Sequence, residues 1–202
     1  AYQEAVAGNP DYDRAIFERY GDIMPEVVEK SGAQNYDQLR EAAYLALSDE
    51  VRSQFDRLPI QTTYHSGDAE YAVPSAMIRD ALGGNLNVFR GGDPHEFLDR
   101  LDPVTGLTDN EMFRAVHDYM GHVAPGSTFR PDGEEIAYAT HAQTMSPLAQ
   151  MALLSETRGQ NSLVNYSGLN ADIIEPMEVA KRQLKERALA EKYLARGGTD
   201  ED

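Results

Sequence analysis

Apolar residues recur at helical spacing along most of the chain, and they alternate with polar residues in two short segments near its middle. The alternating segments, 60–64 and 85–89, predict two strands. We therefore expect a mainly α protein with a small sheet of two or three strands, an α+β fold. The helical spacing predicts helices at 11–20, 25–30, 35–46, 48–58, 74–82, 108–120, 133–145, 147–157 and 175–196.

Local residue patterns indicate where several of these helices begin. Asn35 or Asp37 can cap the helix that runs to about residue 46, and Ser48 can cap the helix that follows it. Thr108 and Glu111 have the three-residue spacing of a capping box, in which side chain and backbone of the two residues bond reciprocally. The helix that begins there leads into the part of the chain richest in chemically active side chains.

Length and composition limit the classes of protein that the chain can belong to. Its 202 residues are typical of one domain, so we expect a single domain over 1–196 and a disordered acidic tail over 197–202. The net charge of −16, from 18 basic and 34 acidic residues, argues against a nucleic-acid partner, because a phosphate backbone requires a basic face. No apolar run approaches the roughly 18 residues of a membrane span.

The sequence contains no cysteine, so any metal ion must be held by histidine, carboxylate or other oxygen ligands. No basic-then-apolar leader opens the sequence, and we expect a cytoplasmic protein.

Three of the five histidines lie within residues 113–166, among apolar side chains. His117 and His122 are five residues apart, which is about 140° around a straight α-helix, so they would not share a face. Gly121 can adopt a left-handed conformation. We therefore expect the helix to end at Met120 and the chain to turn back, so that both imidazoles meet at its C-terminal end. Alternatively, His117 is a core residue and His122 a surface one.

Glu156 is the strongest candidate for a third ligand. It follows the apolar run 148–154, and a carboxylate in such a buried helix must be paired, protonated or bound to a metal. Two histidines and one carboxylate form the ligand set of non-haem Fe(II) oxygenases. The alternative is an ion pair of Glu156 with Arg158 or Arg114.

Three further groups lie between these candidates, namely Glu134, Glu135 and His141. Residues 134, 138, 141 and 145 fall on one helical face. Glu134 or Glu135 can hydrogen-bond a ligand histidine, the usual arrangement around a metal. His141 is a fourth ligand, a general base or a polar residue beneath the site. A dinuclear site becomes possible if His141 and one of the two glutamates all bind metal.

Polar side chains directly after Glu156 are suited to binding a carboxylate or amide substrate. The alternative is that they satisfy the backbone of a helix end around Gly159. The predicted substrate-binding residues are Arg158, Gln160, Asn161 and Asn165.

The stretch from His117 to Thr157 resembles the iron site of the biopterin-dependent aromatic amino acid hydroxylases. The resemblance rests on His117-Asp118-x-x-Gly121-His122-Val123, followed by Phe129, Glu135 and Ser155-Glu156-Thr157. It implies a helical domain around a buried metal site, with His117, His122 and Glu156 as iron ligands. It also implies a pterin cofactor, although no pterin-binding loop is recognisable in the sequence.

A second resemblance is to uncharacterised phage and prophage proteins. These carry a similar series of His-Asp-x-x-Gly-His, Gly-Glu-Glu and Glu-Thr-Arg-Gly-Gln-Asn. This likeness implies a location in the host cytoplasm or in the virion.

Together these features predict a mononuclear non-haem iron monooxygenase that uses dioxygen on a small or amino-acid-like substrate. Asp118 and Glu135 would orient the ligands, and Glu135, His141 and Arg158 would be the catalytic residues. Zn²⁺ at the same site would instead give a hydrolase with Glu135 or His141 as base. The remaining alternative is a non-enzymatic phage virion or interaction protein with a structural or vestigial site. Self-association would use the helix at 175–196.

Overall fold

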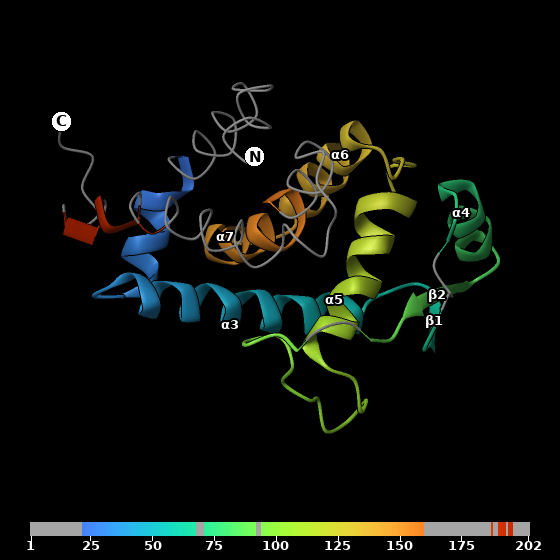
Figure 1. Cartoon of the computed structure of the whole chain (residues 1–202), viewed down its shortest axis with the longest axis horizontal. Coiled ribbons are helices and arrows are strands. Elements are labelled where there is room, and N and C mark those ends of the chain that lie inside the picture. Colours follow the sequence, from blue (N-terminus) through green and yellow to red (C-terminus); the bar gives the residue numbers. More distant parts are fainter. Residues whose placement is uncertain are drawn as a thin grey trace. The chain divides into compact units, whose positions relative to one another are not determined.

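The computed structural model describes residues 22–67, 71–91 and 94–159, together with residues 187, 190–192 and 194–195. These residues are mostly helical and include one small sheet, which confirms the expected α+β class (Figure 1). Within the described ranges, no helix combines the length and apolar character needed to cross a membrane. The helix expected at 11–20 and the tail 197–202 lie outside them. So does the helix expected at 175–196, except for the few positions named.

The described residues fall into two compact units. One lies within Tyr44–Met145, and the other within Ala1–Ala43 and Ser146–Asp202. The expectation of a single domain over 1–196 stays a prediction.

Helix α3, Tyr36–Phe55, is one continuous helix where the sequence pattern predicted two. Its start is as expected, because the Asn35 side chain accepts a hydrogen bond from the backbone of Gln38 at 3.0 Å. Ser48 does not begin a second helix but lies inside α3, only 2 % exposed. No Gly or Pro interrupts α3, and a buried stripe at helical spacing continues past the serine. This stripe is formed by Leu39, Ala43, Tyr44, Leu47 and Val51.

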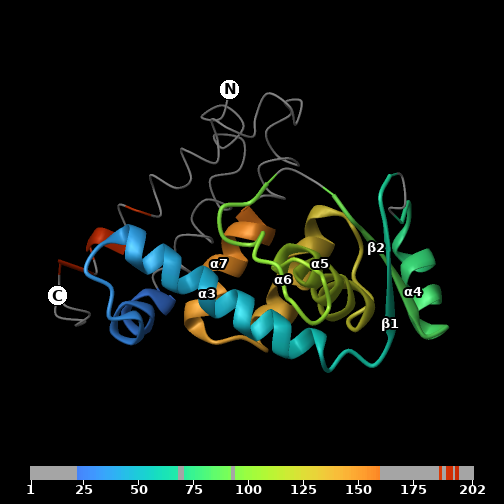
Figure 2. The ribbon, with the colours of Figure 1, turned by 90° about the horizontal axis from the view of Figure 1, so that it is seen from below.

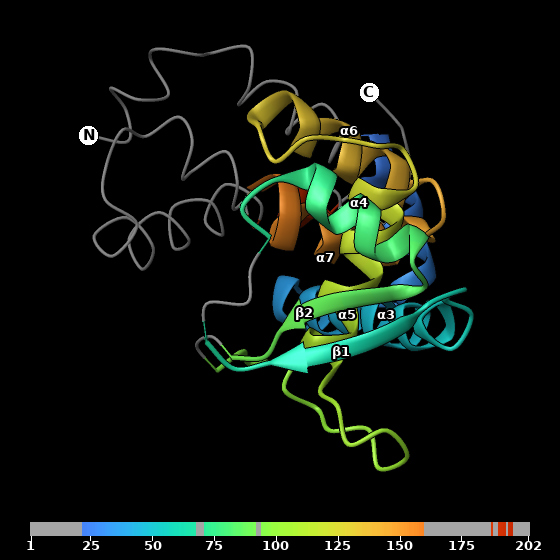
Figure 3. The ribbon, with the colours of Figure 1, turned by 90° about the vertical axis from the view of Figure 1, so that its right-hand side faces the viewer.

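Within Tyr44–Met145, the strands β1, Gln61–His65, and β2, Asn85–Phe89, pair in parallel over their whole length. Parallel strands need a crossover connection. Here it contains α4, Pro74–Leu82, and the sequence predicted a helix at these residues but not the crossover. Figures 2 and 3 show the two strands side by side, with α4 next to them. The core of this part buries Met77, Leu86, Val88 and Ala115.

Helix α5, Asp109–His117, begins with the predicted capping box. The Thr108 hydroxyl accepts from the Glu111 backbone at 3.2 Å, and the Glu111 carboxylate accepts from the Thr108 backbone at 2.8 Å. Asp109 is fully buried and forms ion pairs with Arg52 of α3 and with Arg100. These contacts fix the start of the helix whose last residue is His117.

Two further helices begin with proline at the first helical position, where its missing N–H costs nothing. They are α6, Pro131–Ala142, and α7, Pro147–Leu154. A π-helical segment, η2, Ser155–Gly159, continues α7 and carries Glu156. The helices predicted at 133–145 and 147–157 are therefore confirmed, with their boundaries shifted by a few residues.

Gly133 is required where the chain enters α6. A Cβ at this position would lie 2.1 Å from the carbonyl oxygen of Thr128 and 2.4 Å from its hydroxyl. Because one of these atoms is backbone, a larger residue can be accommodated only if the start of the helix moves away from Thr128.

We expect Gly133→Ala to reduce the free energy of unfolding by about 1–3 kcal/mol, the usual range for overpacking. Urea denaturation followed by circular dichroism measures the change. The matched control is Ala139→Ser at an exposed position of the same helix, with an expected effect within about 0.5 kcal/mol. Equal midpoints for Gly133→Ala and the wild-type chain would contradict this account of the helix start.

Candidate metal centre

Helix α5 continues without a break into η1, a π-helix at Asp118–Val123. The prediction that the helix ends at Met120 with Gly121 in a left-handed conformation is wrong, because Gly121 is not among the positive-φ glycines of the described residues. A π-helix has i→i+5 hydrogen bonds, such as that from the Ala124 backbone to Tyr119 at 2.8 Å.

Because the turn of η1 is wider than that of an α-helix, residues five positions apart lie near the same face. The ring centroids of His117 and His122 are 5.2 Å apart, with the rings perpendicular. The expected meeting of the two imidazoles therefore occurs, through a π-turn rather than a glycine bend.

Gly121 has a packing role in this turn. A Cβ there would lie 3.1 Å from the Cβ of Ala137 and 3.2 Å from Cε1 of His117. Ala137 is fully buried and belongs to α6, which packs on η1. Two small residues thus allow close approach of the two helices. As a result, Glu134, one turn before Ala137, comes close to the histidines.

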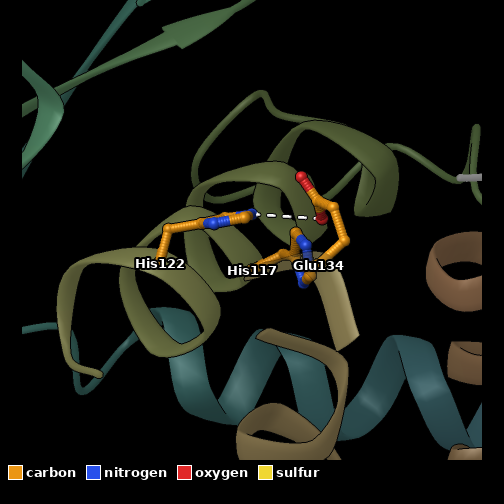
Figure 4. A group of neighbouring side chains, drawn as sticks. All are labelled: His117, His122 and Glu134. Carbon is orange, nitrogen blue, oxygen red and sulfur yellow. Dashed lines mark ion pairs between the residues drawn. The ribbon is translucent and has the colours of Figure 1, made fainter. Parts of the chain in front are cut away.

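His117, His122 and Glu134 form the candidate centre. One potential ligand atom from each lies within 4.8 Å of the other two, and Figure 4 shows the three side chains converging. His122 Nε2 is 3.4 Å from Oε2 of Glu134. Two ligands with bonds of about 2.1 Å to one ion, at a tetrahedral angle, are about 3.4 Å apart. The donor types and this separation fit a divalent transition metal.

The hydrogen bonds of His122 show which of its nitrogens is available. The Ser127 hydroxyl donates its proton to the Gly121 carbonyl at 2.7 Å, so its oxygen accepts from His122 Nδ1–H at 3.0 Å. In the neutral ring, Nε2 then carries a lone pair that faces the Glu134 carboxylate. Two acceptors repel each other at this distance unless a cation lies between them. The alternative is a proton on Nε2 and a simple ion pair.

His117 and His141 are held in their neutral forms by burial. Burial lowers the pKa of His141 to about 4. Burial, followed by the nearby rings of His141 and His122, lowers the pKa of His117 well below 6.5. Neutral imidazole is the form that binds metal ions. Phe113 stacks on His117, and Phe129 contacts His122 edge-on, so aromatic rings flank both histidines.

The structure places some of the residues predicted for the site next to His117 and His122, and others outside this group. Glu134, expected to hydrogen-bond a ligand histidine, pairs with His122 and completes the group of three. His141 is fully buried behind His117, and its Nδ1 lies 3.4 Å from His117 Nδ1. Asp118 and Glu135 are described but do not belong to the group.

Glu156 lies on η2 in the other compact unit, and its role as a ligand stays a prediction. The backbone of Arg158 is part of η2, whereas its side chain lies outside the description. The other predicted substrate-binding residues, Gln160, Asn161 and Asn165, lie outside the described residues.

Two residues at the centre were missed by sequence analysis. Ser127, five residues after His122, orients that ring. Gln54 accepts a hydrogen bond from His141 across 87 positions of sequence. The short spacing of Ser127 from His122 offers a weak signal, but no pattern in one sequence identifies Gln54.

Comparisons with protein-family models, curated proteins and solved structures find no match for this chain. The resemblance of its motifs to the aromatic amino acid hydroxylases and to phage proteins therefore stays a prediction. The functional proposal depends on the chemistry of the centre itself.

The lowered pKa of His141 predicts a pH dependence of stability. Between pH values of about 6.5 and 4 the unfolded chain binds a proton at this residue and the folded chain does not. This contribution to stability is fully present above pH 6.5 and is lost as the pH falls, up to about 3 kcal/mol. Compared with His141→Asn, the metal-free wild-type chain should lose more free energy of unfolding between neutral pH and pH 4. Parallel profiles in urea titrations would contradict the buried, neutral state of His141.

Proposed function

We propose that the chain is a mononuclear non-haem Fe(II)-dependent oxygenase or hydroxylase, with the metal held by His117, His122 and Glu134. The observation that carries the proposal is the geometry of His122. Its Nδ1–H is taken by Ser127, and its Nε2 faces the Glu134 carboxylate at 3.4 Å. Two imidazoles and one carboxylate are the donor set typical of Fe(II) oxygenases.

The arrangement supports this chemistry in two ways. Three protein ligands would leave some coordination positions of an Fe(II) ion open, and dioxygen would bind at those positions. Phe113 and Phe129 pack on the two histidine rings and keep them in place. The proposed substrate, a small or amino-acid-like molecule, follows from the resemblance to the aromatic amino acid hydroxylases.

A zinc-dependent hydrolase is the second candidate. The 3.4 Å separation of His122 Nε2 and Glu134 Oε2 corresponds to a tetrahedral angle, which zinc prefers. Both nitrogens of His141 already face protein groups, His117 and Gln54. Glu135, partly exposed on α6, is therefore the better candidate for the base of such a hydrolase.

We expect the metal-free wild-type chain to bind one Fe(II) ion under anaerobic conditions. Glu134→Gln should weaken Fe(II) binding at least tenfold, because the variant loses a charged ligand. Loss of a hydrogen-bond partner of a ligand already weakens metal binding by 10- to 100-fold, and loss of a ligand itself should cost no less. Calorimetry and metal analysis provide the measurement. Glu41→Gln, at an exposed position of α3, is the matched control, with unchanged affinity expected.

Glu156→Gln belongs in the same series. Loss of binding in Glu156→Gln together with full binding in Glu134→Gln would assign the carboxylate ligand to Glu156. Equal Fe(II) binding by the wild-type chain and by the His117→Ala, His122→Ala double variant would overturn the site.

Dioxygen uptake separates the two candidate functions. The iron-loaded chain, supplied with ascorbate and a panel of amino acids, should consume dioxygen, and the double histidine variant should not. Cleavage of ester or amide substrates by the zinc-loaded chain, without dioxygen uptake by the iron-loaded chain, would favour the hydrolase.

A further inference from the structure

A chain of hydrogen bonds begins at Thr144, passes through the buried side chains of Gln54 and His141, and ends at His117. Thr144 provides a backbone carbonyl and a hydroxyl near the amide of Gln54. A carbonyl only accepts hydrogen bonds, so the NH2 group of Gln54 must face Thr144, with its Nε2 3.0 Å from the hydroxyl. The Thr144 hydroxyl donates in turn to the carbonyl of His141 at 2.7 Å. The orientation of the Gln54 amide is thereby fixed.

The fixed amide determines the tautomer of His141. Oε1 of Gln54 lies 3.1 Å from His141 Nε2 and can only accept, so Nε2 of His141 carries the proton. The ring is fully buried, where a neutral imidazole avoids the cost of an unpaired buried charge, and its Nδ1 therefore carries a lone pair. That lone pair faces Nδ1 of His117 at 3.4 Å.

We propose that Gln54 and His141 form a relay that fixes the tautomer of His117. His117 donates from Nδ1–H to His141, and its Nε2 lone pair is left for the metal. This inference rests on the proposed metal centre and adds two positioning residues to it. Ser127 fixes the tautomer of His122 in the same way, so both imidazoles would bind the ion through Nε2.

The opposite tautomer would disable the centre. If Nδ1 of His141 carried the proton, it would donate to Nδ1 of His117, and the proton of His117 would lie on Nε2. Nε2 could then bind a metal only after losing that proton. Hydrogen-bond partners of metal-binding histidines typically change metal affinity 10- to 100-fold.

The first measurement detects the tautomers directly in the metal-free chain. Long-range ¹H–¹⁵N spectra of histidine-labelled protein at neutral pH report which ring nitrogen carries the proton. Loss of signals in His117→Asn and His141→Asn assigns the rings. We expect Nδ1–H for His117 and Nε2–H for His141. A proton on Nε2 of His117 overturns the relay, whether or not the chain binds metal.

The second measurement compares zinc affinities of variants by competition with a chelating dye. Gln54→Met keeps the size of the side chain but removes the acceptor, and it should weaken zinc binding about 10- to 100-fold. His141→Leu should have a similar effect. His141→Asn should restore much of the affinity, because its Oδ1 can accept from His117 Nδ1–H. Gln143→Met, at an exposed glutamine directly after α6, is the matched control.

The outcomes distinguish the relay from the metal centre on which it depends. The expected tautomers in a wild-type chain that binds no zinc would support the hydrogen-bonded relay and overturn the proposed function. Zinc binding unchanged by Gln54→Met and His141→Leu would overturn the relay and leave the metal centre in place.

Discussion

The π-helical turn at η1 is the constraint on which the candidate centre depends. An α-helix would place His117 and His122 about 140° apart. The i→i+5 pattern of η1 instead brings the two rings edge to face, with centroids 5.2 Å apart. Such turns are less favourable than regular α-helix, so packing must hold this one in place. The packing of α6 on η1 does so, and the same packing brings Glu134 to His122.

Polar groups next to the two imidazoles determine how the two rings are oriented. Ser127 takes the Nδ1 proton of His122, and His141 lies against Nδ1 of His117. Both groups are supplied by the unit that carries the histidines. Nδ1 of each ring thus faces a polar protein group.

The sequence predicted the features that depend on neighbouring residues. The capping box of Thr108 and Glu111 spans three positions, and the two strands follow from alternation over five residues. The meeting of His117 and His122 was also predicted, but for the wrong reason. Gly121 was interpreted as a helix end because glycine often has that role. In the structure it lies where a helix that begins ten residues later packs closely, and a Cβ there would be 3.1 Å from the Cβ of Ala137.

Features formed by distant residues could not be predicted in this way. Ser48 was interpreted as a cap, although the buried stripe of α3 continues through it. The sequence left open whether Glu134 or Glu135 hydrogen-bonds a ligand histidine, and only the packing of α6 on η1 shows Glu134 next to His122. Gln54 reaches His141 across 87 positions, and nothing in its local sequence distinguishes it from other glutamines.

Anomalous diffraction from crystals of the metal-loaded chain tests the central claim most directly. Data collected on both sides of the iron or zinc absorption edge identify the element and its position. The account predicts one peak at about 2.1 Å from Nε2 of His117, Nε2 of His122 and an oxygen of Glu134. A peak elsewhere, or a direct hydrogen bond from a protonated His122 to Glu134 with no peak between them, would contradict it.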